Sequence, residues 1–593
     1  MSGHAPDPSQ LSAIEVPPSG RQIVLAGPGS GKTEVVSALV ARLLDEGVDA
    51  ADGLLVISFS NAAVHAVDTR LRERGTAPVA VQTMDSLAGE ILRDLSDEEV
   101  TGFDRRVTAA TRALADDSWD RLDALEHLVV DEIQDVVGVR ADFLLALLDA
   151  LPGDCGFTLL GDPAQGIYDW QLRGDERPLS STTSSELLAR VEKMEGVEVK
   201  HLTGQYRARS RDARRAIALR EEALRGDPDG RIEQFLADLV PVGSVDDAVA
   251  SARGWSGTTV FLTRNNGQAL LTAGAIAATG VAVEVRRSAQ QRVLASWIAR
   301  VLGDHPTPGV TRDELEQRVT AVRPDLDPAD LWRAMRSVAR GRGREVDLAA
   351  LAAGLRRPRP LVPDLLEPVR SPFVVSTVHR AKGLEFDNVV HVDFPEKPWI
   401  DESDEDEDDE YRVLFVAVSR AREVLARADG PDDRRVRSSR RSDGSRRWYL
   451  GGRAKWMTLG YELRPDDLDR SGPPGDDPAA TQRHLAERVR PGDPLTIRID
   501  LRRSTLRQPV WELVHDGVLV GRTSPEFGES FSRKVGPRER SSRGWPRLSG
   551  ARVEGVATVA GDPQPGPVGR HGLWLAPVSP GMLTIDWNGD RDD

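Results

Sequence analysis

Cysteine and long apolar runs are nearly absent from this sequence. Cys155 is the only cysteine among 593 residues, so no internal disulfide can form. No apolar run is long enough to span a bilayer, and the first residues, MSGHAPDPSQ, lack the apolar core of a signal peptide. We therefore expect a cytoplasmic protein without a membrane partner, in which Cys155 is a small buried apolar side chain.

Basic residues are also fewer than acidic residues. The 78 lysines and arginines are outnumbered by 94 acidic residues, which gives a formal net charge of −16. This balance argues against a protein that binds nucleic acid through a uniformly basic surface. It is compatible with a local basic or aromatic groove, because the field that acts on a bound strand is local. The length indicates several domains, each with a sizeable core.

A glycine-rich stretch, AGPGSGKT at residues 26–33, follows an apolar run and precedes a helical pattern. Its glycines let several backbone N–H groups turn into one concavity, which binds phosphate oxygens together with the positive end of the helix. Lys32 is placed to reach the β- and γ-phosphates, and the Thr33 hydroxyl to ligate Mg²⁺. The strict pattern begins with glycine where this chain has alanine. The expected phosphate-loop residues are Ala26, Gly27, Gly29, Ser30, Gly31, Lys32 and Thr33.

Two adjacent carboxylates follow a second apolar run, in the sequence VVDEIQD at 129–135. Asp131 can hold Mg²⁺, directly or through water, and Glu132 can orient and deprotonate an attacking water. Because the pair follows the phosphate loop within the same expected sheet, the sequence predicts a nucleotide hydrolase rather than a solvated acidic loop.

The acidic sequence DEIQD resembles the second motif of the UvrD/Rep family of superfamily 1A DNA helicases. Seven further stretches match that family's motifs in order, so the resemblance covers about residues 8–425. These stretches are SQLSAI (9–14), SFSNAA (58–63), TMDSL (83–87), GDPAQGIYDW (161–170), QYR (205–207), TVHRAKGLEF (377–386) and EYRVLFVAVSRA (410–421).

The resemblance implies ATP and Mg²⁺ as cofactors and assigns roles around the nucleotide. Gln10 matches the family's adenine-reading glutamine, Tyr206 should stack on the adenine, and Glu385 should bind the ribose or support the site. Gln165 matches the glutamine that senses the γ-phosphate. The expected catalytic residues are Lys32, Glu132, Gln165, Arg207 and Arg420.

Arg207 and Arg420 match the two arginines that the family's second domain contributes to the γ-phosphate. Such an arginine can supply about 10³–10⁵ in rate by stabilising the charge of the transition state. We expect both to reach the nucleotide only when the cleft between the domains closes, which would couple hydrolysis to domain spacing.

The resemblance also implies a single-stranded DNA site. Phe59 and Trp170 match aromatics that interleave with unstacked bases, and stacking of this kind contributes roughly 1–3 kcal/mol per base whatever the sequence. The expected DNA-contact residues are Phe59, Asn61, Thr83, Ser86, Trp170 and His379.

Some positions depart from the family's pattern. The third motif usually continues Trp-Arg-Gly, whereas this chain has WQLRG at 170–174, so the arginine is displaced to Arg173 or lost. Gln205 stands where asparagine is usual, and Asp85, next to Ser86, replaces a histidine and should repel a phosphate. The insertions are short, which favours translocation and ATP hydrolysis over strong strand separation.

We therefore expect an α/β fold of two RecA-like P-loop NTPase domains with a helical insertion and a small C-terminal all-β domain, a barrel or sandwich. The expected boundaries are 1–204 for the first domain, with a short helical insertion at about 89–125; 205–287 and 370–428 for the second; 288–369 for the helical insertion; 429–493 for an Arg-rich and Pro/Gly/Asp-rich linker; and 494–593 for the β-domain. The arginine run at 434–447 could follow a nucleic-acid backbone or form a disordered tether.

These inferences predict an ATP-dependent helicase or translocase that moves 3′→5′ on single-stranded DNA or tailed duplex DNA, in repair, recombination or defence. The alternative is a DNA-sensing ATPase switch that recruits a nuclease or another repair or defence partner through the C-terminal β-domain. The short insertions favour the alternative, whereas the intact Glu132, Arg207 and Arg420 favour an active motor.

Overall fold

The computed structural model describes residues 5–59, 61–96, 100–116, 119–173, 179–286, 293–341, 343–357, 361–367, 371–394, 407–432, 434–440, 446–453, 457–535 and 544–587. The chain forms two compact units. The first comprises Met1–Val240, Ala381–Val389 and Ile400–Leu425, and the second comprises Pro241–Arg380, Val390–Trp399 and Ala426–Asp593.

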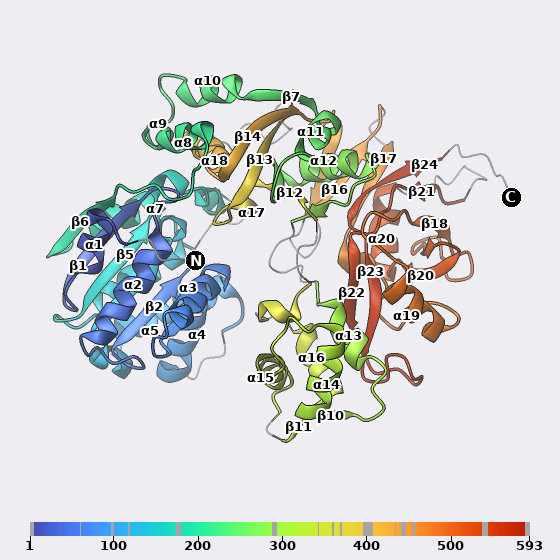
Figure 1. The fold of residues 1–593 in the computed structure, drawn as a ribbon, viewed down its shortest axis with the longest axis horizontal. Coiled ribbons are helices and arrows are strands. Elements are labelled where there is room, and N and C mark those ends of the chain that lie inside the picture. The colour runs from blue at the N-terminus through green and yellow to red at the C-terminus, as the bar shows by residue number, and fades with distance from the viewer. Residues whose placement is uncertain are drawn as a thin grey trace. The chain divides into compact units, whose positions relative to one another are not determined.

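The first unit is built on a six-stranded parallel sheet in the order β3-β2-β4-β5-β1-β6. Figure 1 labels β1, β2, β5 and β6 of this sheet. Its strands are β1 (Arg21–Ala26), β2 (Leu54–Ser58), β3 (Ala80–Thr83), β4 (His127–Asp131), β5 (Gly156–Gly161) and β6 (Val197–Leu202). Both faces are covered, because Leu128 and Val130 of β4 join one apolar core while Val129 joins another. The parallel sheet with two covered faces confirms the fold expected for this part of the chain.

Helices and short 3-10 turns lie between these strands, before the first and after the last of them. The helices of the first unit are α1 (Pro8–Ile14), α2 (Lys32–Asp45), α3 (Asn61–Glu73), α4 (Met84–Leu95), α5 (Phe103–Asp116), α6 (Val139–Asp149), α7 (Ser184–Val191), α8 (Arg211–Ala218), α9 (Arg220–Leu224), α10 (Arg231–Asp238) and α18 (Glu407–Val418). The 3-10 turns are η1 (Asp120–Ala124), η2 (Ile133–Asp135), η3 (Pro163–Gln165) and η4 (Asp169–Arg173). The end of α4, α5 and η1 occupy the residues 89–125, where a short helical insertion was expected.

A second six-stranded sheet has the order β7-β14-β13-β8-β12-β9, and β12 pairs in parallel with both β8 and β9. The strands are β7 (Val240–Ser244), β8 (Thr259–Thr263), β9 (Glu284–Val285), β12 (Phe373–Thr377), β13 (Phe386–Asp393) and β14 (Ala421–Asp429), and the accompanying helices are α11 (Val245–Ala252), α12 (Asn266–Ala278) and α17 (Val378–Ala381). The two RecA-like sheets predicted from the sequence are thus present.

The helical insertion of the second unit confirms the pattern seen in the sequence, and a small β-ribbon accompanies it. Its elements are α13 (Ser296–Leu302), β10 (Gly309–Thr311), α14 (Arg312–Val322), α15 (Pro328–Ala339), β11 (Glu345–Asp347) and α16 (Leu348–Arg356). Trp297, Leu331 and Leu351 share a core with Leu573 from the C-terminal region. The insertion is therefore packed together with the end of the chain.

The C-terminal region contains antiparallel sheets, as expected, together with helices. Its strands are β15 (Val436–Arg440), β16 (Arg446–Gly451), β17 (Thr458–Leu463), β18 (Thr496–Ile499), β19 (Trp511–His515), β20 (Val518–Arg522), β21 (Arg547–Ser549), β22 (Gly555–Ala560), β23 (Leu573–Val578) and β24 (Gly581–Asp586), and its helices are α19 (Pro478–Glu487) and α20 (Pro525–Val535). They form the sheets β15-β16-β17-β24-β21, β18-β19-β20 and β22-β23.

The segment 429–493 differs from the linker expected there. It supplies β15, β16, β17 and α19, and β17 pairs with β24 from the last residues that the structure describes. Arg447, in the arginine run, is 1% exposed and forms a bidentate ion pair with Asp467, while Tyr461 packs edge-on against Phe527. Because buried charge pairing and aromatic packing hold this segment in place, it belongs to the C-terminal domain.

A tight hairpin turn and the single cysteine are two local features of this fold, and the burial of Cys155 is as expected. Asp516 and Gly517 have φ values of 48° and 79° and form the two-residue loop between His515 and Val518, the geometry of a tight hairpin. Cys155 is fully buried, and burial raises the pKa of its thiol to about 12. Within the described residues, no helix is long and apolar enough to cross a membrane.

Candidate nucleotide-binding site

The phosphate loop lies between β1 and α2 and requires glycine at two positions. Gly29 and Gly31 have φ values of 77° and 85°, in the left-handed region that side chains disfavour. A Cβ atom on Gly31 would lie 2.6 Å from Nε2 of Gln10, and one on Gly29 would lie 2.6 Å from Cβ of Arg207. The loop is thus approached closely by two segments that the sequence assigned to the same site.

Gln10 and Tyr206 lie near the Ser30 end of this loop. The buried Gln10 amide donates to the Ser30 carbonyl at 2.9 Å, and its oxygen accepts from the Asp7 N–H at 3.0 Å. The Tyr206 hydroxyl donates to Asp7 at 2.6 Å. Although burial opposes it, hydrogen bonding from Ser9 and Tyr206 lowers the pKa of Asp7 to about 2. Asp7 therefore links the two residues expected to recognise adenine.

The segment Gln205–Arg207 lies directly over the phosphate loop. Nε2 of Gln205 donates to the Pro28 carbonyl at 2.7 Å, and the Tyr206 N–H donates to the Gly29 carbonyl at 2.8 Å. Oε1 of Gln205 accepts from the backbone N–H of Arg207 at 2.6 Å. Gln205, which departs from the usual asparagine, thus joins the segment to the loop through both ends of its amide.

Glu132 has a left-handed backbone conformation and a carboxylate that stays ionised. Its φ of 60° and ψ of 44° place a non-glycine residue in the left-handed region, a conformation that costs of order 1–3 kcal/mol and concentrates at functional sites. Nζ of Lys32 lies 3.1 Å from Oε2 of Glu132, and Gln134 donates to the same oxygen. Burial opposes ionisation, but the charges of Lys32 and Lys382 hold the pKa of Glu132 at about 2. Its carboxylate is therefore ionised at neutral pH.

Asp131 is 4% exposed at the end of β4, and its oxygen accepts from the Glu132 N–H at 3.0 Å. Burial and the charge of Glu132 raise the pKa of Asp131 to about 7, so another cation beside it would be stabilising. A carboxylate and the Thr33 hydroxyl are oxygen ligands of the kind that Mg²⁺ takes.

No group of three or more His, Cys, Asp or Glu side chains forms a metal site among the residues that the structure describes. Mg²⁺ at a nucleotide is held by one or two protein oxygens together with phosphates and water. Asp131 and Thr33 fit that role.

Gln165 connects two parts of the expected catalytic set. It is buried, its Nε2 donates to Asp162 at 2.7 Å, and its Oε1 accepts from Nη2 of Arg420 at 2.7 Å. Arg420 is 1% exposed and also donates through Nε to the Val416 carbonyl at 3.0 Å. Burial and the nearby charge of Arg207 lower the pKa of Arg420 to about 9. The expected sensor and one expected arginine are thus in direct contact.

Glu385 forms an ion pair with Arg207, at 2.5 Å between Oε1 and Nη2, and another with Arg422 at 2.6 Å. Burial opposes the effect, but these arginines lower the pKa of Glu385. Among the described residues, Nε of Arg207 has no hydrogen-bond partner although it is buried. Glu385 thus lies beside two arginines, and its role at the nucleotide remains a prediction.

Arg207, Glu385 and Arg420 belong to the same compact unit as the phosphate loop. The sequence placed all three in a second domain beginning at residue 205, and this boundary differs from the structure. The reason is local packing: the segment after β6 bonds to the phosphate loop, and Phe415 of α18 shares a core with Ala164 of η3.

Phe59 forms an aromatic pair that the sequence did not predict. Its ring stacks on Tyr168, with centroids 5.6 Å apart and an angle of 28° between the planes. Tyr168 lies two residues before Trp170 in the same motif, which is the signal that could have identified it. Burial raises the pKa of its hydroxyl.

Lys382 contacts both Tyr168 of this aromatic pair and residues of the candidate nucleotide site. Its ammonium lies 5.0 Å from the centre of the Tyr168 ring and donates to Asp135 and to the Gln165 carbonyl. Burial raises the pKa of Asp135 to about 6 even though the Lys382 charge opposes that shift. A continuous set of contacts thus runs from Gln165 through Lys382 to Tyr168.

The other expected DNA-contact residues are only partly described. Thr83 caps α4 by accepting from the Ser86 N–H at 3.3 Å, and their hydroxyls lie 2.9 Å apart. Asp85, expected to repel a phosphate, is paired with Arg140 at 2.9 Å, which compensates its charge. His379 is half-buried in α17 of the second unit. The side chains of Asn61, Trp170 and Arg173 lie outside the described residues.

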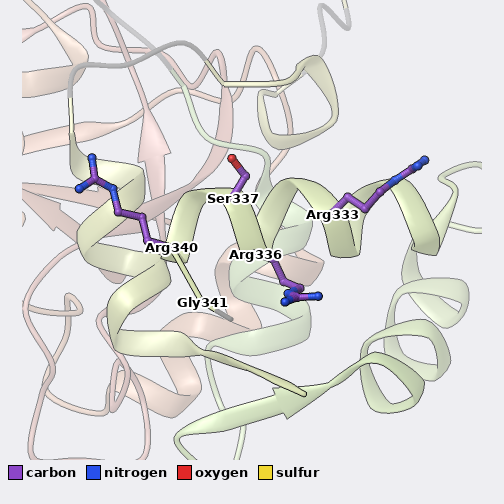
Figure 2. Close-up of a pocket in the computed structure, with 5 residues that line it drawn as sticks. All are labelled: Arg333, Arg336, Ser337, Arg340 and Gly341. Atoms are coloured by element: carbon purple, nitrogen blue, oxygen red, sulfur yellow. The ribbon is translucent and has the colours of Figure 1, made fainter. Parts of the chain in front are cut away.

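A hollow of about 500 Å³ on α15 is also lined by arginines. Figure 2 shows that the side chains of Arg333, Arg336 and Arg340 leave the helix in different directions. They do not converge as the residues around the phosphate loop do, so this surface is no second candidate for a nucleotide site.

These features define the class of the protein. A phosphate loop between a parallel strand and a helix, an acidic pair at the end of another strand and a second sheet in which β12 pairs in parallel with β8 and β9 together make a P-loop nucleotide-binding protein with two RecA-like sheets.

Comparison with protein families narrows this class. Residues 7–108 match the model of the UvrD/REP helicase N-terminal domain, and residues 372–426 match the model of the UvrD-like helicase C-terminal domain. The resemblance predicted from the motifs is confirmed over these two stretches, which are similar to UvrD-like helicase domains.

Similarity to individual proteins is confined to short stretches. The chain is 27% identical over 106 residues to the probable DNA helicase II homolog of Rickettsia conorii, covering 18% of this chain and 16% of that protein. It is 35% identical over 88 residues to DNA helicase IV of Escherichia coli K12, covering 15% and 13%. The chain thus spans less than a fifth of the length of these relatives.

Among solved structures, the chain is similar to Pif1 helicase from Bacteroides in complex with ADP-AlF3 and ssDNA. The TM-score is 0.33 and the identity 13%, over 72% of this chain and 92% of that one. A likeness at this level carries no argument about function.

Proposed function

We propose that the protein is an ATP-dependent DNA motor of UvrD/Rep type, which moves 3′→5′ on single-stranded DNA and hydrolyses ATP as it moves. The observation that carries the proposal is the contact network of the first unit, in which Gln165 touches Arg420 on one side and Lys382 on the other. The polarity and the DNA substrate come from the family resemblance.

ATP would bind with its phosphates on the backbone N–H groups of residues 27–33 and on Lys32. Gln10 and Tyr206 lie at the far end of the same loop, where the adenine would sit between the glutamine amide and the tyrosine ring. Mg²⁺, held by Thr33 and Asp131, would neutralise phosphate charge.

Glu132 is the group that would accept a proton from the attacking water, because its carboxylate is ionised and lies at the phosphate loop. In the structure it is paired with Lys32. When Lys32 turns to the phosphates, Glu132 loses that partner and its oxygen becomes available to water. Arg207 and Arg420 would stabilise charge on the departing phosphate.

Gln165 would couple nucleotide binding to DNA through its side chain and its backbone carbonyl. Its side chain meets Arg420, so a terminal phosphate competes for that contact. Its carbonyl is held by Lys382, whose ammonium faces the Tyr168 ring. A shift of this turn on nucleotide binding would move Tyr168 against Phe59, where an unstacked base can be gripped.

The second candidate is a DNA-sensing ATPase switch with little unwinding, acting in repair, recombination or defence through a nuclease or another partner. The observation that favours it is the shared core of the helical insertion and the C-terminal region, which contains Leu573 and Trp297. A partner on the C-terminal sheets would therefore act on the insertion as well.

Strand displacement on duplexes with 3′ or 5′ tails separates the two candidates. The motor predicts ATP-dependent displacement from the 3′-tailed duplex and little from the 5′-tailed one. Strong DNA-stimulated ATP hydrolysis without displacement would instead support the switch. Displacement restricted to the 5′-tailed duplex would contradict the proposed polarity.

A further inference from the structure

Arg220 reaches the phosphate loop although it lies outside every motif that the sequence singles out. It is the first residue of α9, and its Nε donates to Oδ1 of Asp162 at 2.8 Å. A Cβ atom on Gly27 would lie 3.4 Å from Cδ of Arg220 and 3.8 Å from its Nε. The side chain therefore lies between the start of the phosphate loop and the third motif.

The expected roles of the neighbouring residues put this position at the terminal-phosphate end of the loop. The opposite end is marked by Gln10, which contacts Ser30 and Gly31 and is expected to read the base. Asp162, the partner of Arg220, also accepts from Gln165, the expected γ-phosphate sensor. Arg220 thus belongs to the same cluster as the expected sensor.

Packing holds Arg220 in this place. Ala223, one turn further along α9, is fully buried in a core with Ala164 of η3 and Phe415 of α18. The short helix is therefore fixed to the turn that carries Gln165. Arg220 keeps 19% of its side chain exposed, so a bound phosphate can still reach it.

The Nη1 atom of the Arg220 guanidinium forms only an exposed ion pair. Nη1 donates to Glu221 at 2.8 Å, but the Glu221 side chain is 73% exposed. An exposed ion pair of this kind contributes little to stability, so a phosphate can replace it at little cost. Because a guanidinium has five N–H donors in a plane, Nε can hold Asp162 while the Nη donors bind phosphate oxygens.

We propose that Arg220 is a third arginine for the terminal phosphate of a bound nucleoside triphosphate. It would supply the charge that the third motif lacks, since Gln171 follows Trp170 where the family pattern has arginine. The proposal rests on the proposed function only in assuming a nucleoside triphosphate site. It makes Arg220 a residue that distinguishes triphosphate from diphosphate.

The test is equilibrium binding of a fluorescent ADP and of a fluorescent, non-hydrolysable ATP analogue to the full chain without DNA. For Arg220→Ala we expect triphosphate affinity to fall tenfold or more, while diphosphate affinity changes less than threefold. Arg209→Ala is the matched control, because Arg209 is an exposed arginine of the same segment, paired with Glu423. It should leave both affinities near those of the wild type.

Arg220→Gln separates phosphate binding from a purely structural role. Glutamine can still donate to Asp162, so thermal stability should stay near that of the wild type while the preference for triphosphate is lost. Retention of that preference by Arg220→Gln would overturn the proposal, as would equal loss of both nucleotides in both variants. If the wild type binds neither nucleotide, the proposed function fails as well, so the two failures can be told apart.

Discussion

The side-chain oxygen of Gln165 accepts a hydrogen bond from Arg420 at 2.7 Å, and both side chains are buried. The expected phosphate sensor and the expected catalytic arginine therefore already touch within the first unit. A nucleotide that enters this site has to exchange or share that contact, which makes the pair the point where nucleotide state can change the structure.

Replacing Arg420 should remove most of the chemical step. For Arg420→Ala we expect kcat to fall by about 10³-fold or more, because the charge that develops on the phosphate loses its stabilisation. Single-turnover ATP hydrolysis measures this directly. Arg209→Ala is again the control, and a kcat within a few fold of the wild type in Arg420→Ala would contradict the assignment.

The titration of Asp131 should be visible in stability. The pKa of Asp131 is about 7 in the folded chain, compared with an ordinary value of 3.8, so ionisation of this carboxyl destabilises the fold. The loss of stability is absent below about pH 4, grows as the pH rises and is complete above about pH 7. The free energy of unfolding of Asp131→Asn, relative to that of the wild type, should therefore increase by at least about 1 kcal/mol from pH 5 to pH 8.

Urea unfolding in EDTA at the two pH values measures this difference. Asp149→Asn, at an exposed carboxyl on α6, serves as the control. The pKa of Asp135 is also raised, to about 6. The pH dependence of the free energy of unfolding should therefore be weaker in Asp131→Asn than in the wild type, without vanishing. An identical pH dependence in both proteins would show that Asp131 is not penalised by burial.

The aromatic pair should bind DNA. Tyr168→Ala and Phe59→Ala should each weaken binding of single-stranded DNA by roughly 1–3 kcal/mol, the contribution of one stacked base. Tyr168→Phe retains the ring and should bind nearly as the wild type does. Fluorescence anisotropy with a labelled oligonucleotide measures the affinities. Unchanged binding in both alanine variants would place the DNA elsewhere.

The shared core of the second unit should make the insertion and the C-terminal sheets unfold together. Leu573→Ala removes a fully buried side chain from a core that also contains Trp297 and Leu351, so stability should fall by about 2–5 kcal/mol. Hydrogen exchange should then accelerate in both α13 and β22. Leu506→Ala, at a side chain 74% exposed, is the control. Faster exchange in only one region would contradict a common core.

The sequence predicted the parts of this fold that depend on local signals. The strand that enters the phosphate loop, the helix that follows it and the acidic pair after β4 all follow from short patterns of apolar, glycine and acidic residues. The approach of Gln205 and Arg207 to the loop agreed with the motif order, although the boundary of the compact unit did not.

The parts that the sequence missed depend on contacts between distant residues. Arg447 reads as part of a solvated basic run, yet it is buried because Asp467 and Glu462 accept its hydrogen bonds. The pairing of β17 with β24 joins strands more than a hundred residues apart, and no local pattern encodes it. Arg220 and Tyr168 likewise gain their positions only when helices and turns pack.

The central claim is tested most directly by phosphate release from ATP with and without single-stranded DNA, for the wild type, Lys32→Ala and Glu132→Gln. The account predicts hydrolysis that DNA stimulates at least tenfold in the wild type and that both substitutions abolish, while Glu132→Gln still binds ATP. Wild-type turnover in either variant would contradict it, because hydrolysis would then not occur at this loop.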